Sequence, residues 1–240
     1  MMKRSLFVAG LLALVLSAAA LPAFAHEEHC MEVGGQIDKA TGECIQHAVL
    51  DIKSVYPIEA AHLSDAMAEA IDSFINGSYA AFVGEFANAG FIPGSGNSWA
   101  LDIQNEIVQG VSTVSVVFTR YTYTGGANGT QDYATITADF ASGSLLTLED
   151  VFMDGVDPYT TLQPLAEAAL TELLGDAAIP DMMAPGLELT PENYRRWALT
   201  TDSLNLYFDE YQVAPGAAGS LMVSIPLSSL SGVLQPQFLS

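Results

Sequence analysis

The residues of this chain that are able to do chemistry are few, and their spacing matches no common catalytic motif. All four histidines precede residue 63, and the 240 residues include only two cysteines. Nucleophilic catalysis needs a base such as histidine within reach of a serine or cysteine, and no nucleophile motif adjoins these histidines. The pattern therefore favours a non-catalytic protein, with a small hydrolase as the alternative. The histidines are His26, His29, His47 and His62.

Two further patterns concern metal ions. If the signal peptide described below is removed, the new N-terminal amine and the imidazole of His26 would lie close to His29, a set that chelates copper or zinc. Asp150, Asp154 and Asp157 suggest calcium, but the glycine and final glutamate of an EF-hand loop are missing. Helix capping and solvation explain these aspartates. We therefore predict no metal site and no cofactor, and keep metal binding by the processed N-terminus as an alternative.

The N-terminus has the layout of a secretory signal peptide. Lys3 and Arg4 precede an apolar run over residues 6–20, and an Ala-Phe-Ala triplet ends at residue 25. The run is shorter than the roughly 20 apolar residues of a membrane-spanning helix. We expect removal of residues 1–25 and a periplasmic or secreted product without a membrane span.

The predicted mature chain is strongly acidic. Removal of residues 1–25 leaves five basic residues against 28 acidic ones, a formal net charge of −23. Such a surface repels nucleic acid, because binding there depends on Lys and Arg contacts to phosphate. It would attract a cationic protein and speed the encounter. Solubility in a saline habitat explains the same charge without a partner, and the sequence leaves both explanations open.

The two cysteines predict a small separate flap. Cys30 and Cys44 lie close together, and an exported protein meets an oxidising compartment, so we expect one disulfide. Glycines and Asp38 between them favour a short hairpin. The bond would stabilise the flap by roughly 3 kcal/mol, since it closes a loop of about 15 residues. The predicted organisation is a signal peptide at 1–25, a disulfide-stapled flap at 26–45 and a single domain at 46–240.

The apolar pattern of that domain predicts an α+β fold, with an antiparallel sheet and two main helices packed against it. A β-hairpin is expected over residues 119–140, turning through the glycine-rich stretch GGANG at 125–129, four of whose residues tolerate positive φ. Helices are expected at 63–87 and 158–174, the second capped by Asp157. Further strands are expected at 45–58, 101–107, 194–199, 204–208 and 221–225. This order allows two β-α-β-β halves in tandem.

Two blocks of the sequence resemble a known family. The first runs from YTYTGGAN at 121–128, through a strand ending in Asp139-Phe140, to LTLEDVF at 146–152; the second covers LNLYFDEYQVAPGAAG at 204–219 and VSIPLSSL at 223–230. Their ordered spacing, over roughly residues 45–235, is similar to the RsiV/PdaC-type extracytoplasmic domain of unknown function. In RsiV this domain belongs to an anti-sigma factor and binds lysozyme, and in PdaC it accompanies a separate deacetylase domain. The chain departs from the family at Asn128, usually a histidine, and at Gly216, usually an aromatic residue.

The resemblance implies a cell-envelope protein and a binding role. We expect a secreted, non-catalytic module that recognises a cell-wall component such as a peptidoglycan fragment, or a cationic wall-active protein such as lysozyme. A small envelope hydrolase related to deacetylases is the alternative. The candidate surface joins two glycine-bearing loops, at 124–129 and 211–219, expected side by side at one sheet edge with acidic groups around them. Its residues are Tyr121, Tyr123, Gly125, Gly126, Asn128, Tyr211, Pro215 and Gly219.

Overall fold

The computed structural model describes residues 35–37, 39, 44–46, 50–89 and 98–239, and the chain divides into two units, at 1–47 and 48–240. In the first unit, β1 (Gly35–Ile37) pairs antiparallel with β2 (Cys44–Gln46), which is the short hairpin expected there. The predicted signal peptide, Cys30 with its predicted disulfide, and the histidines at 26, 29 and 47 lie outside the described residues.

The second unit begins with a four-stranded sheet. Its order is β3 (Leu50–Ser54), β4 (Trp99–Gln109), β5 (Thr113–Tyr123) and β6 (Thr130–Asp139). The predicted hairpin is present, with antiparallel arms that bring Thr122 opposite Thr130. β3 differs from the expected antiparallel arrangement, because it pairs parallel with β4. A parallel pair needs a crossover connection, and the long helix between these strands supplies it.

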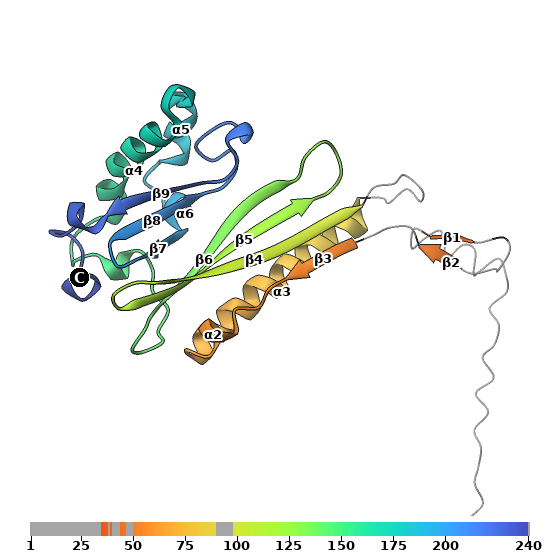
Figure 1. The fold of residues 1–240 in the computed structure, drawn as a ribbon, viewed down its shortest axis with the longest axis horizontal. Helices are drawn as coiled ribbons and strands as arrows, with labels where there is room; N and C mark the ends of the chain where they lie inside the picture. The colour runs from red at the N-terminus through yellow and green to blue at the C-terminus, as the bar shows by residue number, and fades with distance from the viewer. Residues whose placement is uncertain (1–34, 38, 40–43, 47–49, 90–97, 240) are drawn as a thin grey trace, which may run out of the picture. The chain divides into compact units, whose positions relative to one another are not determined.

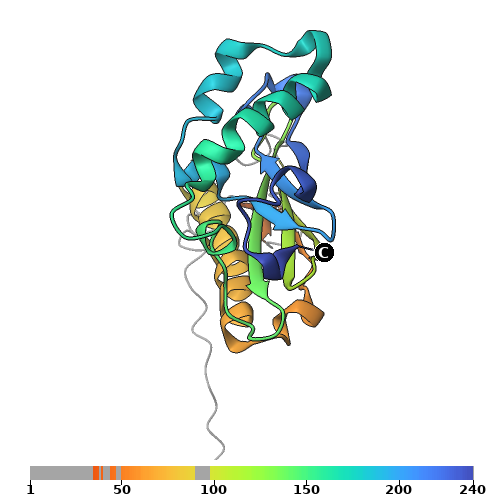
Figure 2. The same ribbon diagram turned by 90° about the vertical axis from the view of Figure 1, so that its left-hand side faces the viewer.

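That helix, α3 (Asp65–Asn88), follows the short α2 (Ile58–Ala61) and matches the helix expected at 63–87. Ser64 caps it, because its side-chain oxygen accepts the Met67 N–H at 3.1 Å. Figures 1 and 2 show α3 along one face of the four-stranded sheet. The buried residues of this interface are Met67, Ile71 and Phe82 on the helix and Leu101, Ile103, Val114, Val116, Phe118 and Ala138 on the strands.

The remainder of the unit is a second, helix-covered sheet. A helical turn η1 (Glu149–Val151) precedes α4 (Pro158–Leu174), and then come η2 (Gly175–Ala177), α5 (Pro180–Gly186) and α6 (Pro191–Tyr194). The strands β7 (Trp197–Leu199), β8 (Ser203–Phe208) and β9 (Leu221–Pro226) form an antiparallel sheet. Three further turns complete the chain: η3 (Gly216–Ala218), η4 (Leu227–Ser229) and η5 (Pro236–Phe238).

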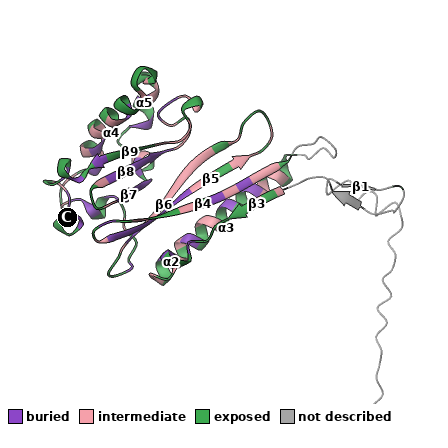
Figure 3. Ribbon diagram, viewed as in Figure 1, coloured by how far each residue is buried: buried purple, intermediate pink, exposed green. Residues whose placement is uncertain are grey.

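The α+β class is therefore confirmed, with the strands divided between two sheets. The unit is layered as α4, the β7–β9 sheet, the β3–β6 sheet and α3 (Figure 1). Buried positions run along the strands and the inner sides of the helices, whereas the tip of the β5–β6 hairpin is largely exposed (Figure 3). The first half of the unit has the element order β-α-β-β-β, and the second half has helices followed by three strands. The unit therefore does not consist of two β-α-β-β halves in tandem.

A polar network joins the two sheets around Arg196. This side chain is buried, and its Nε donates to the Tyr133 carbonyl on β6 at 2.9 Å. Its other nitrogens bond to the carboxylate of Asp209 and, at 3.2 Å, to the side-chain oxygen of Gln212. Asp209 also accepts the Tyr133 N–H at 2.9 Å. The network therefore positions β6, which carries the hairpin loop, relative to the segment that follows β8.

Candidate functional site

The hairpin loop is built as its glycines predict, and its two tyrosines brace it. Gly125 and Gly126 have φ values of +98° and +100°, the left-handed region that favours glycine. Tyr123 donates its hydroxyl to the Gly126 carbonyl at 2.9 Å. The Tyr121 ring lies against Gly129, where a Cβ atom would come within 2.4 Å of ring carbon Cζ. Tyr121 is nevertheless 40% exposed.

The second glycine-bearing loop places a tyrosine on the surface. Tyr211 is 65% exposed and has φ +68°, the one positive φ of a non-glycine residue among those described. Its ring lies over Gly216, where a Cβ would come within 2.2 Å of Cζ. Gly219 also has positive φ, at +70°, and Pro215 is half-buried. The ring thus occupies space that a side chain at position 216 would need.

Hydrogen bonds join the bases of these two loops. The Gln131 side chain, at the start of β6, donates to the Ser220 hydroxyl at 2.6 Å, and its N–H donates to the Glu210 carboxylate at 3.3 Å. Both loops lie at the same end of the second unit (Figure 1). The structure thus brings the predicted residues to one end of the fold, with Glu210 between them. Their role in binding stays a prediction.

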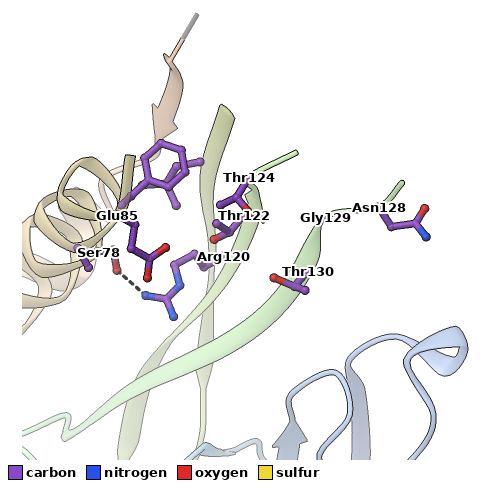
Figure 4. Close-up of a pocket in the computed structure, with 11 residues that line it drawn as sticks. Ser78, Glu85, Arg120, Thr122, Thr124, Asn128, Gly129 and Thr130 are labelled. Carbon is purple, nitrogen blue, oxygen red and sulfur yellow. Dashed lines mark hydrogen bonds between the residues drawn. The ribbon is translucent and has the colours of Figure 1, made fainter. Parts of the chain in front are cut away.

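A cavity of about 340 Å³ opens beside the hairpin loop, between α3 and the strands. Arg120 lies at its centre (Figure 4). Its Nε and Nη2 donate to the Asp132 carboxylate at 3.1 and 2.8 Å, and its Nη1 donates to the Ser78 hydroxyl at 3.1 Å. The cavity is lined by Ser78, Ala81, Phe82, Glu85, Leu101, Arg120, Thr122, Thr124, Asn128, Gly129 and Thr130.

The cavity is lined by both hydrogen-bond donors and hydrogen-bond acceptors. Figure 4 shows the Glu85 carboxylate and the Arg120 guanidinium facing the same space, with Thr122 beside them and Asn128 at the outer rim. Asn128 is the one predicted site residue that lines it. Ser78 is 6% exposed and accepts a hydrogen bond from a guanidinium, which draws electron density from its oxygen. These groups suit recognition of a polar ligand better than nucleophilic attack.

Ser78, Glu85 and Arg120 were not among the predicted site residues, although one signal was present in the sequence. Val116 and Phe118 face α3, and Arg120 continues the same alternating face. A charged residue at the end of an apolar face must find a partner or a cavity. The register provides both, because Asp132 is directly opposite Arg120 on β6.

Two of the three aspartates that suggested calcium, Asp150 and Asp157, accept hydrogen bonds from nearby backbone N–H groups. The Asp150 carboxylate accepts the Thr147 N–H at 2.7 Å, and Asp157 accepts the N–H of Tyr159 at 3.1 Å at the start of α4. Within the described ranges, no group of three or more His, Cys, Asp or Glu side chains is placed to hold a metal ion. A search of the same residues finds no helix with the length and apolarity needed to cross a membrane.

Comparisons with known proteins are consistent with the sequence motifs. The chain is 34% identical over 127 residues to the peptidoglycan-N-acetylmuramic acid deacetylase PdaC of Bacillus subtilis, covering 53% of this chain and 27% of PdaC. It is 27% identical over 119 residues to esterase Rv3036c of Mycobacterium tuberculosis, covering 50% of this chain and 51% of the esterase. The chain thus spans about a quarter of one relative and about half of the other.

A crystal structure of a DUF3298 family protein from Pseudomonas aeruginosa is similar at a TM-score of 0.47, with 22% identity over 67% of this chain and 71% of that one. Residues 149–228 match the family model DUF3298, described as a protein of unknown function. That range contains the loop at 211–219 and all three strands of the second sheet, β7, β8 and β9. The hairpin loop at 124–129 lies outside it. The sequence matches to PdaC and to the DUF3298 model confirm that the chain resembles the PdaC-type domain of unknown function.

Proposed function

We propose that this protein is a non-catalytic binding module of the cell envelope, and that the Arg120 cavity holds a glycan fragment of the cell wall. The observation that carries the proposal is the polar cavity itself. A guanidinium fixed by Asp132 and Ser78, a carboxylate at Glu85 and the hydroxyl of Thr122 converge on one space. Sugars present many hydroxyl and amide groups, each of which can donate or accept a hydrogen bond.

The shape and composition of the cavity support this ligand class. Its volume falls within the roughly 300–1,000 Å³ of typical small-molecule sites. Ala81, Phe82 and Leu101 form the apolar part of its wall. The exposed Tyr121 and Tyr211 add rigid amphipathic area on neighbouring loops.

The relatives support an envelope setting. PdaC is named for its action on peptidoglycan, and the match covers 27% of PdaC. We infer export through the predicted signal peptide. Recognition of a cationic protein such as lysozyme rests on the acidic charge, and it is the competing outcome of the experiment below.

The experiment titrates the purified protein with a soluble disaccharide-peptide fragment of peptidoglycan, followed by calorimetry. Thr122→Val removes one cavity hydroxyl and keeps the side-chain shape. Thr119→Val is the matched control, since Thr119 is on the same strand but lines a different cavity, on the side of Tyr207. Thr122→Val is expected to weaken binding about five-fold, because one hydrogen bond to the ligand is lost. Thr119→Val is expected to leave the affinity unchanged.

Two results would contradict the proposal. The first is the absence of any heat of binding with wall fragments, together with lysozyme binding that disappears at high salt. That result would identify a protein partner bound through charge. The other is hydrolysis of an acyl ester or an acetylated glycan that Thr122→Val or Glu85→Gln abolishes, which would identify an enzyme.

A further inference from the structure

A second cavity, of about 390 Å³, lies away from the hairpin loop, between β6, η1, α4 and α6. Its walls combine apolar and aromatic side chains with a few polar groups. The lining residues are Thr135, Thr137, Leu146, Thr147, Leu148, Glu149, Tyr159, Pro191, Tyr194, Arg195 and Trp197. None of these residues belongs to the Arg120 cavity, so the two cavities are separate.

Arg195 gives this cavity an uncommitted positive charge. Among the described residues from 50 onward, the other basic side chains form ion pairs: Lys53 with Asp51, Arg120 with Asp132, and Arg196 with Asp209. Arg195 is exposed, and its guanidinium has no hydrogen-bond or ion-pair partner within that part of the chain. Asp209 interacts electrostatically with Arg195, but its carboxylate is bonded to Arg196. A guanidinium presents a planar fork that matches a carboxylate.

Glu149 gives the same cavity a negative charge. Its carboxylate accepts a hydrogen bond from the Tyr159 hydroxyl, and this bond lowers the pKa of Glu149, so the group is ionised at neutral pH. Tyr159 stays protonated, because burial and the adjacent carboxylate raise its pKa. No ion pair links Glu149 to Arg195. One cavity therefore presents an anion and a cation that do not satisfy each other.

We propose that this cavity binds a short zwitterionic peptide, with its carboxylate on Arg195, its amine on Glu149 and its side chains against the apolar wall. A ligand with one charge would satisfy only one of the two groups. A dipolar ligand satisfies both, and the Leu146, Leu148 and Trp197 side chains favour an apolar body between the charges. This site and its ligand class are independent of the glycan proposal, because they involve other residues.

The test uses tryptophan fluorescence. The chain has two tryptophans, Trp99 in the core beside α3 and Trp197 in this cavity. The Trp99→Phe protein therefore leaves a single reporter. The probe is the dipeptide alanyl-alanine, compared with N-acetyl-alanyl-alanine, which lacks the ammonium group, and alanyl-alanine amide, which lacks the carboxylate.

The expected result is saturable binding of the free dipeptide and binding at least about ten-fold weaker for each blocked form, since each loses a charge-assisted hydrogen bond. Arg195→Gln should weaken binding of the free dipeptide by a similar factor and leave the affinity for alanyl-alanine amide unchanged. Glu149→Gln should leave the affinity for the N-acetyl form unchanged. Lys53→Gln is the control, since it removes one exposed cation elsewhere. No saturable response to the free dipeptide, or equal affinity for all three probes, would overturn the proposal.

Discussion

Replacing Arg196 with methionine tests whether the buried ion pair joins the two sheets. The Arg196 side chain is 7% exposed and that of Asp209 is 23% exposed. The substitution leaves the Asp209 carboxylate without its cation and the Tyr133 carbonyl without its Arg196 donor. Removing one partner of a buried pair typically costs about 3–5 kcal/mol, because an uncompensated charge remains.

A second ion pair in the same domain provides the matched control. Arg120 and Asp132 are 32% and 26% exposed, so solvent screens them more strongly. We expect Arg120→Met to cost only about 1–2 kcal/mol, below the value for a buried pair. For a domain of this size, about 3–5 kcal/mol lowers Tm by on the order of 6–20 °C. Urea denaturation of both variants, followed by far-UV circular dichroism, measures the difference.

The pH dependence gives a further check. Burial raises the pKa of Asp209, so its protonated form is favoured in the folded state. Asp209 therefore stabilises the folded state below its unfolded pKa, and this contribution is lost as pH rises through the raised folded pKa. Without Arg196 this loss is larger, so the deficit of Arg196→Met relative to wild type should shrink as pH falls toward about 4.

A second substitution should partly rescue the Arg196→Met variant. Adding Asp209→Asn to Arg196→Met should restore part of the stability, because the amide oxygen can still accept the Tyr133 N–H without carrying a charge. The role of the Arg196–Asp209 pair is contradicted if Arg196→Met costs no more than Arg120→Met, or if the deficit of Arg196→Met grows in acid.

The remaining predictions concern four single substitutions. Tyr159→Phe should cost about 0.5–1 kcal/mol at neutral pH, and the difference should vanish as pH falls through the lowered folded pKa of Glu149, measured by urea denaturation between neutral and acidic pH. Burial raises the pKa of Tyr194 to about 12, so stability should fall above about pH 10, and Tyr194→Phe should reduce this alkaline loss; phenolate absorbance at 295 nm follows the ionisation. Gly186→Ala should cost about 1–3 kcal/mol, because its Cβ would meet a backbone oxygen at 2.1 Å. Gly216→Ala should cost less in thermal unfolding, since its Cβ meets an exposed tyrosine ring that can move; equal losses would contradict this.

The local elements follow from the sequence with good accuracy. The helices expected at 63–87 and 158–174 are α3 (Asp65–Asn88) and α4 (Pro158–Leu174), and the glycine-rich turn lies at the tip of the predicted hairpin. These features depend on residues close together in the chain. Side-chain periodicity, caps and positive-φ glycines specify them without reference to the rest of the fold.

The sites depend on residues that are distant in the chain. Arg120 is positioned by Ser78, which is 42 residues away, and Gln131 joins the two loops by bonding to Ser220, which is 89 residues away. The parallel pairing of β3 and the division of the strands into two sheets are also long-range choices. The sequence alone determines which stretches become helix, strand or turn, because those preferences are local. Only the tertiary structure decides which charged side chains are paired and which face a cavity, because that depends on contacts that form when the layers pack.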